Sequence, residues 1–135
     1  MLKDKAEYYY IQNGMNCAEA VFLGANDEYG LGLPQDSARL IAGFGGGIGC
    51  GSLCGALAGA VSVIGQMLIV QDAHKTEGFS DECKKLHWEF EERLGSTLCS
   101  ELAAKNKRED GTRCKITVDL ACEVLESFLK EKGLI

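Results

Sequence analysis

Apolar residues recur at intervals of three and four along almost the whole chain, with polar residues between them. This spacing is typical of amphipathic α-helices, whereas the alternation that marks a half-buried strand is weak throughout. No internal repeat or linker divides the sequence, and its 135 residues suit one domain. We therefore predict a single all-α domain over residues 1–135, a bundle of about five to seven helices around a glycine-rich central helix. The expected helices cover residues 3–13, a stretch beginning at 17, 35–44, 52–71, 80–95, a short stretch after 96, and 114–132.

Capping residues support several of these helix boundaries. Asn16 precedes the second helix and Glu19 follows three residues later, which is the arrangement of a capping box. Ser80 is the expected N-cap of the fifth helix. Gly14 and Gly95 follow the first and fifth helices, where glycine readily takes the left-handed conformation that ends a helix.

The central segment, residues 40–71, contains no charged side chain and is long enough to span a bilayer. Its many glycines dilute the hydrophobicity, Ser52, Ser62 and Gln66 add polar atoms, and no basic cluster flanks it. We therefore expect a buried central helix and no membrane association.

Glycines also crowd the approach to this helix. Neither G-x-G-x-x-G nor G-x-x-x-x-G-K-[ST] is present, and no lysine is available to reach a phosphate, so nucleotide binding is not expected. Gly51, Gly55 and Gly59, spaced by four, would form a flat stripe that another helix or a bulky cofactor could approach closely. Helix packing is the favoured interpretation, and Gly55 and Gly59 are the candidate contacts of a bound cofactor.

The charge balance narrows the choice of partners. With 14 basic and 20 acidic side chains the net charge is −6, and the pI is about 4.9. Such a chain repels phosphates, so nucleic acid is not an expected partner. Lys3, Asp4 and Lys5 stand where a secretion signal would place apolar residues. We expect a cytoplasmic protein, and in the cytosol thiols are mostly kept reduced.

Seven cysteines are far more than the usual share for a chain of this length. In a reducing compartment, many cysteines point to metal or redox chemistry rather than to a disulfide framework. Four of them lie in or beside the first turn of an expected helix: Cys17, Cys54, Cys99 and Cys114. A helix N-terminus favours a thiolate, which would lower the pKa of these thiols and raise their reactivity and metal affinity. Arg113 and Lys115 would lower the pKa of Cys114 further.

The other cysteines carry weaker signals. Cys50 lies four residues before Cys54, so the two thiols could form a close pair. Cys83 and His87, four apart on the fifth helix, could present two ligands to one metal, although an ordinary half-buried helix face is the favoured interpretation. Cys122 lies on the apolar stripe of the last helix and is expected in the core.

The aromatic residues and histidines give no sign of further chemistry. Tyr8, Tyr9 and Tyr10, with Trp88 and Phe90, are expected to be packing and surface residues of amphipathic helices. Two histidines and carboxylates that decorate helix faces form no hydrolase motif.

The surroundings of the cysteines resemble a known family. Residues 54–59 read CGALAG and fit the motif CGAxxG; NCAEA at 16–20 and FGGG at 44–47 precede them, and FEE at 90–92 and GSTLC at 95–99 follow. From about residue 13 to the start of the last helix, the chain resembles the redox-active protein family defined by the pattern C_GCAxxG_C_C. The resemblance implies a redox role for the same four helix-start cysteines, and it leaves Cys50, Cys83 and Cys122 outside the pattern.

Three functions are compatible with these residues. The first is thiol–disulfide exchange or electron transfer by a thiol-dependent oxidoreductase without a cofactor, with Cys54 at its centre and Cys50 or Cys17 resolving the mixed disulfide. The second is a zinc or iron–sulfur site ligated by Cys17, Cys54, Cys99 and Cys114. The third is a non-catalytic helical interaction protein whose cysteines fill the core. A redox partner protein, a small thiol or an electron carrier is the expected partner, and the glycine stripe would also allow a homodimer.

Overall fold

The computed structural model describes all 135 residues, and its regular elements are helical. The α-helices are α1 (Leu2–Glu7), α2 (Cys17–Tyr29), α3 (Arg39–Ala42), α4 (Gly55–Leu68), α5 (Phe79–Leu94), α6 (Cys99–Asn106) and α7 (Lys115–Glu131). Three short helical turns accompany them: η1 (Tyr8–Gln12), η2 (Gln35–Ala38) and η3 (Gly47–Gly51). The prediction of an all-α fold is confirmed. No helix combines the length and the hydropathy that spanning a bilayer requires.

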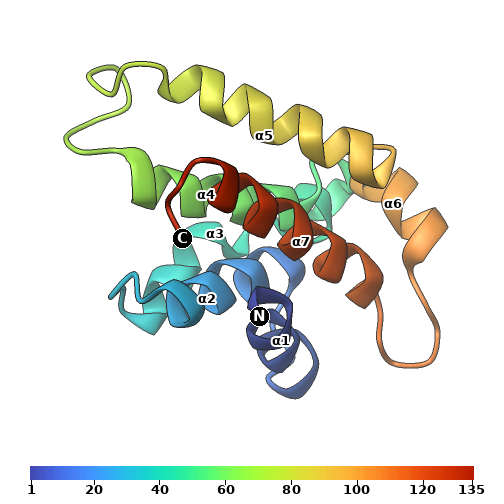
Figure 1. Cartoon of the computed structure of the whole chain (residues 1–135). Coiled ribbons are helices and arrows are strands. Elements are labelled where there is room, and N and C mark those ends of the chain that lie inside the picture. The colour runs from blue at the N-terminus through green and yellow to red at the C-terminus, as the bar shows by residue number, and fades with distance from the viewer.

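The helices form three layers around one core. Figure 1 shows α5 along one side of the molecule, α4 and α7 in the middle, and α1 and α2 on the opposite side. The most extensive contact joins α2 to α4, while α7 packs against both α1 and α5. Thirty buried apolar residues form a continuous cluster between these helices, and Leu57, Phe90 and Phe128 are among its largest members. Burying a side chain of this size contributes about 1.5–3 kcal/mol, so this cluster is the main source of stability.

The caps explain where the helices begin and end. Asn16 caps α2 as predicted: its Oδ1 accepts the N–H of Glu19 at 3.0 Å, and its own N–H donates to Glu19 Oε1 at 3.0 Å. Gly95 ends α5 in the left-handed conformation, also as predicted. The prediction that Ser80 caps α5 is wrong, because Gly78 is the N-cap with φ 77° and α5 begins at Phe79. The left-handed turn at Gly78 starts the helix early enough to place Ser80 inside its first turn.

The central helix α4 is shorter than predicted, because it begins at Gly55 and ends at Leu68. Four consecutive residues before it, 46–49, have positive φ angles between 60° and 69°. Three of these residues are glycines, which adopt this conformation without steric cost, and the fourth is Ile48. The left-handed run turns the chain sharply before Cys54, so the cysteine lies at the start of α4 rather than inside it.

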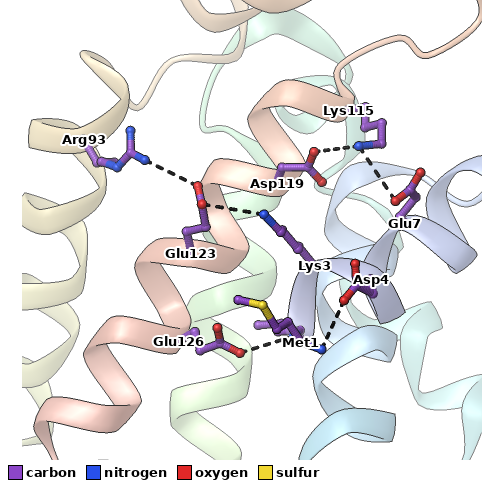
Figure 2. A network of polar contacts seen from close by, with 10 residues as sticks. Met1, Lys3, Asp4, Glu7, Arg93, Lys115, Asp119, Glu123 and Glu126 are labelled. Atoms are coloured by element: carbon purple, nitrogen blue, oxygen red, sulfur yellow. Dashed lines mark hydrogen bonds and ion pairs between the residues drawn. The ribbon is translucent and has the colours of Figure 1, made fainter.

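Ion pairs join α1 to α7 on the surface of the bundle. Figure 2 shows Lys115 between Asp119 and Glu7, with Nζ–O distances of 2.7 Å and 3.8 Å. A turn further along α7, Glu123 pairs with Lys3 at 3.9 Å. These pairs are partly open to solvent, and surface pairs of this kind contribute about 0–1 kcal/mol each. Their main consequence is orientation, because they align α1, and the turn η1 that follows it, along the first half of α7.

Candidate functional site

The four cysteines selected from the sequence all lie at helix starts. Cys17 is the first residue of α2 and Cys99 the first residue of α6, while Cys54 and Cys114 are the N-caps of α4 and α7. The prediction about their location is therefore confirmed. All seven cysteines of the chain are free thiols in this structure.

The glycine-rich turn and α4 hold Cys17 in place. The Asn16 side-chain amide donates to the carbonyl of Ala42 at 2.9 Å, which fixes the start of α2 against the end of α3. The backbone N–H groups of Gly46 and Ala18 favour a thiolate at Cys17. A Cβ at Gly55 would lie 2.6 Å from Cys17 Sγ, so the sulfur packs directly against the first residue of α4. Cys17 is thereby brought next to Cys54, which precedes that residue in the chain.

A short backbone pairing brings Cys99 to the same place. The Cys54 N–H donates to the carbonyl of Thr97 at 2.8 Å, and the Cys99 N–H donates to the carbonyl of Ser52 at 2.6 Å. These bonds flank an antiparallel bridge between the two leucines at 53 and 98. Because alternate residues of an extended segment share a face, Cys54 and Cys99 project to the same side of this pairing. The two chain segments could not be paired from the sequence, since only three residues of each take part.

The four sulfurs form one electrostatic group. Burial raises the pKa of Cys54 to about 11, and the charges of Cys17 and Cys99 add to that shift. Burial also raises the pKa of Cys17, with further contributions from Cys99 and Cys114. Burial also raises the pKa of Cys114, and the charge of Cys99 raises it further. Lys107 and Arg113 partly offset this rise. Negative charge on Cys99 therefore disfavours a thiolate at each of the other three sulfurs.

These pKa directions correct the expectation that helix starts lower the thiol pKa. Backbone N–H groups at the starts of α2 and α4 do stabilise the Cys17 and Cys54 thiolates, but burial outweighs them. Lys115 does not act on Cys114 as expected, because its ammonium pairs with Asp119 and Glu7. The four residues differ in exposure as well: Cys54 is 4% exposed, whereas Cys17, Cys99 and Cys114 are half-buried.

The remaining cysteines lie outside the four helix starts. Cys50 is exposed, and its thiol donates to the carbonyl of Gly47 at 3.5 Å. The sulfur charges that raise the pKa of Cys54 are those of Cys17 and Cys99. Cys83 packs against the core from α5. Cys122 is 1% exposed within the core, as predicted.

No metal-ligand set is formed by the side chains as they are placed. No three His, Cys, Asp or Glu side chains lie in an arrangement that could hold a metal ion, and this includes the four cysteines and the Cys83–His87 pair. The imidazole of His87 instead makes an edge-on contact with Trp88, with ring centroids 4.9 Å apart. Zinc and iron–sulfur clusters both need several thiolates around one centre, and the cysteines do not form such a set in this structure.

The glycines proposed to contact a cofactor are covered by α2. A Cβ at Gly59 would lie 2.7 Å from the carbonyl oxygen of Ala18, and one at Gly55 would meet Cys17. Gly51 lies outside α4 and faces Ser100 at the start of α6. Gly55 and Gly59 therefore allow α2 to pack closely on α4. α2 occupies the space that a cofactor would need there.

Tyr10 is a neighbour of the cysteines that the sequence does not predict, whereas the predicted effect of Arg113 on the pKa of Cys114 is confirmed. The Tyr10 hydroxyl accepts the backbone N–H of Cys114 at 2.9 Å, and the Arg113 guanidinium stacks on the Tyr10 ring. Three consecutive tyrosines carry no signal that distinguishes Tyr10 from its neighbours. Its role depends on the contact between η1 and the start of α7, residues about a hundred positions apart.

Comparison with known families supports the redox character of this site. The family described as "Putative redox-active protein (C_GCAxxG_C_C)" matches residues 15–128. The chain belongs to this family of redox-active proteins, and the match includes all four helix-start cysteines. No curated protein and no solved structure matches the chain.

Proposed function

We propose that this protein exchanges thiols and disulfides through Cys17 and Cys54, with Cys17 as the attacking sulfur and Cys54 as the resolving sulfur. The observation that carries the proposal is the packing of Cys17 Sγ against Gly55, immediately beside the backbone of Cys54. Thiol–disulfide exchange needs an accessible sulfur and a second thiol within reach of it. The two helix starts supply both.

The different exposure of the two residues assigns their roles. Cys17 is half-buried, so a partner disulfide reaches it first, whereas Cys54 is almost fully enclosed. Two backbone N–H groups, from Gly46 and Ala18, stabilise the thiolate that forms at Cys17 during attack. The pKa of about 11 keeps Cys54 protonated until the mixed disulfide has formed at Cys17. The Cys54 sulfur attacks that disulfide in the second step.

The reaction balances with a disulfide as the oxidant. The Cys17 thiolate attacks one sulfur of the partner disulfide, a new S–S bond forms, and the first partner thiolate leaves. The Cys54 sulfur then attacks Cys17, which releases the second partner thiolate and leaves an intramolecular Cys17–Cys54 disulfide. The two protons lost by the protein thiols are taken up by the two released thiolates. The protein is oxidised by two electrons and the partner disulfide is reduced.

The raised pKa values indicate the direction in which the protein works. A strongly oxidising dithiol is one whose reduced form is stabilised by a low thiol pKa. Here burial raises the pKa of both Cys17 and Cys54 and outweighs the backbone N–H groups that favour their thiolates, so a low thiol pKa does not stabilise the reduced form. We therefore propose that the protein acts as a reductant of disulfides, with a small disulfide or a protein disulfide as its substrate.

The proposal is tested with reduced protein and glutathione disulfide. After acid quenching and alkylation of the remaining thiols, peptide mass spectrometry is expected to show a Cys17–Cys54 crosslink in the wild type. Cys54→Ser is expected to accumulate a stable glutathione adduct on Cys17, because the resolving thiol is gone. Cys17→Ser is expected to leave Cys54 unmodified, because Cys54 is buried.

Cys83→Ser is the matched control, since Cys83 packs on α5 away from the site and its loss should leave the crosslink unchanged. If adducts form only on Cys50 and Cys83 in the wild type while Cys17 and Cys54 stay free, the proposal is wrong.

A further inference from the structure

A groove of about 350 Å³ opens on the surface between α2, α3 and α4, and no cysteine lines it. Its apolar lining comes from Phe22 of α2, from Leu33 in the loop after α2, and from Leu40 and Ile41 of α3. Phe22 and Ile41 are buried, whereas Leu33 is half-buried. The groove is therefore a largely apolar hollow that the thiol chemistry does not use. Its polar residues are Ser37, Ser62 and Gln66.

Leu40 stands at the edge of this groove with its side chain 87% exposed. The turn η2 runs directly into α3, and Ala38 and Ile41, three residues apart, are both buried. Leu40 is left on the outer side of α3, where it takes no part in the core. A single exposed leucine is ordinary, but this one lies beside a hollow lined with side chains of the same kind.

Hydrogen bonds fix the walls of the groove. Asn26 of α2 is 8% exposed; its amide donates to the Leu33 carbonyl at 2.8 Å, and its Oδ1 accepts the Leu33 N–H at 3.0 Å. On the α4 side, the Ser62 hydroxyl already donates to the carbonyl of Ala58 at 3.0 Å. The groove is thus preformed, and a surface that need not reorganise binds a partner at a lower entropic cost.

The charges beside Leu40 match a second copy of the same surface. Asp36 and Arg39 are exposed, and neither takes part in an ion pair within the chain. They are the only charged residues between positions 29 and 71, so this segment has no net charge and the rest of the chain carries the −6. A twofold axis repeats each contact in reverse, which allows Arg39 of each copy to meet Asp36 of the other. Two copies meeting here avoid the repulsion that their acidic surfaces would impose.

We propose that this groove is a homodimer interface, in which Leu40 of each copy inserts into the groove of the other and Arg39 pairs with Asp36 across the twofold axis. Gly55 and Gly59, the stripe that the sequence offered as a dimer contact, are covered by α2, so the dimer uses a different face. An unrelated partner would need a matching apolar side chain and a matching pair of charges, whereas a second copy of this chain carries both. The association does not depend on the thiol chemistry of the proposed function.

Sedimentation equilibrium of the 135-residue chain measures the dimer dissociation constant, with the protein kept reduced so that the exposed Cys50 forms no intermolecular disulfide. The wild type is expected to dimerise with a Kd of about 1–100 μM, as suits a small interface between stable monomers. Leu40→Ala should raise the Kd about a hundredfold, because losing one buried leucine side chain costs about tenfold and the twofold axis repeats the loss. Leu40 is exposed in the monomer, so the variant should keep the Tm of the wild type.

Trp88→Ala is the matched control. Trp88 is also an apolar residue with an exposed side chain, at 53%, but it belongs to α5, on the opposite side of the molecule from α2 (Figure 1). Its Kd should equal that of the wild type.

Charge reversal tests the pairing across the axis. Asp36→Arg and Arg39→Asp should each raise the Kd about tenfold, because like charges would then meet, and the variant with both changes should regain the wild-type Kd. The proposal is overturned if the wild type stays monomeric up to about 1 mM, whether or not another protein or a small apolar ligand fills the groove. It is also overturned if Leu40→Ala dimerises as tightly as the wild type, or if the double reversal fails to rescue the single ones.

Discussion

Replacing Gly59 by alanine tests the packing of α2 on α4, the contact that brings Cys17 to Cys54. An added Cβ would lie 2.7 Å from the carbonyl oxygen of Ala18 and 3.2 Å from Cβ of Val21. The nearer atom belongs to the backbone of α2, so moving it would cost conformational energy. Overpacking of this kind costs about 3 kcal/mol, and the better helix propensity of alanine returns about 1 kcal/mol. The expected net loss of unfolding free energy is about 2 kcal/mol.

Gly65→Ala is the matched control in the same helix. There an added Cβ would meet only the ring of Phe79, at an ordinary 3.8 Å. The variant should therefore gain about 1 kcal/mol. For a chain of this length, 1 kcal/mol corresponds to about 3–4 °C in Tm. Calorimetry is expected to show Tm falling by about 7 °C for Gly59→Ala and rising by about 3 °C for Gly65→Ala. A Gly59→Ala variant as stable as the wild type would refute the close approach of the two helices.

Three further predictions concern the cap of α2, the thiol pKa and the core. Asn16→Ala should lower the unfolding free energy by about 1–2 kcal/mol in urea titrations, because the capping box and the bond to Ala42 are lost. The free energy of unfolding should fall as pH rises from 9 to about 11, because the unfolded chain releases the Cys54 proton near 9.0 and the folded protein holds it to about 11. Cys54→Ala should make this fall with pH less steep. An equally steep fall in the variant would contradict the raised pKa of Cys54. Phe90→Ala, at a fully buried position, should cost about 3–5 kcal/mol, and a loss below about 1 kcal/mol would show that its site is not close-packed.

The helices were predictable because their signals are local. The spacing of apolar residues, the box formed by Asn16 and Glu19, and the glycine at 95 each act within a few residues of one another. The predicted start of α5 was wrong because Gly78, in the left-handed conformation, is the N-cap in place of Ser80. The sequence does not show which of these two residues will cap the helix. The start of α4 was misplaced because the left-handed run before it includes Ile48, a residue type that gives no warning of that conformation.

The candidate site was predictable in its members but not in its chemistry. The four cysteines share helix starts and a recognisable pattern, so they could be selected one by one. The pKa values of Cys17 and Cys54 depend on burial, which tertiary packing decides, and burial raises them where the sequence predicted that they would be lowered. The contact of Tyr10 with Cys114 joins two distant segments and has no local signal at all.

The most direct test of the central claim is a redox titration of the intact protein against glutathione buffers, with each free thiol counted by alkylation and peptide mass spectrometry. Cys17 and Cys54 are expected to lose their free thiols together, in one two-electron step that yields their crosslinked peptides. Cys122, buried in the core, should stay free throughout and serves as the internal reference. Independent titration of Cys17 and Cys54, or a crosslink of either one only to Cys50, would contradict the account.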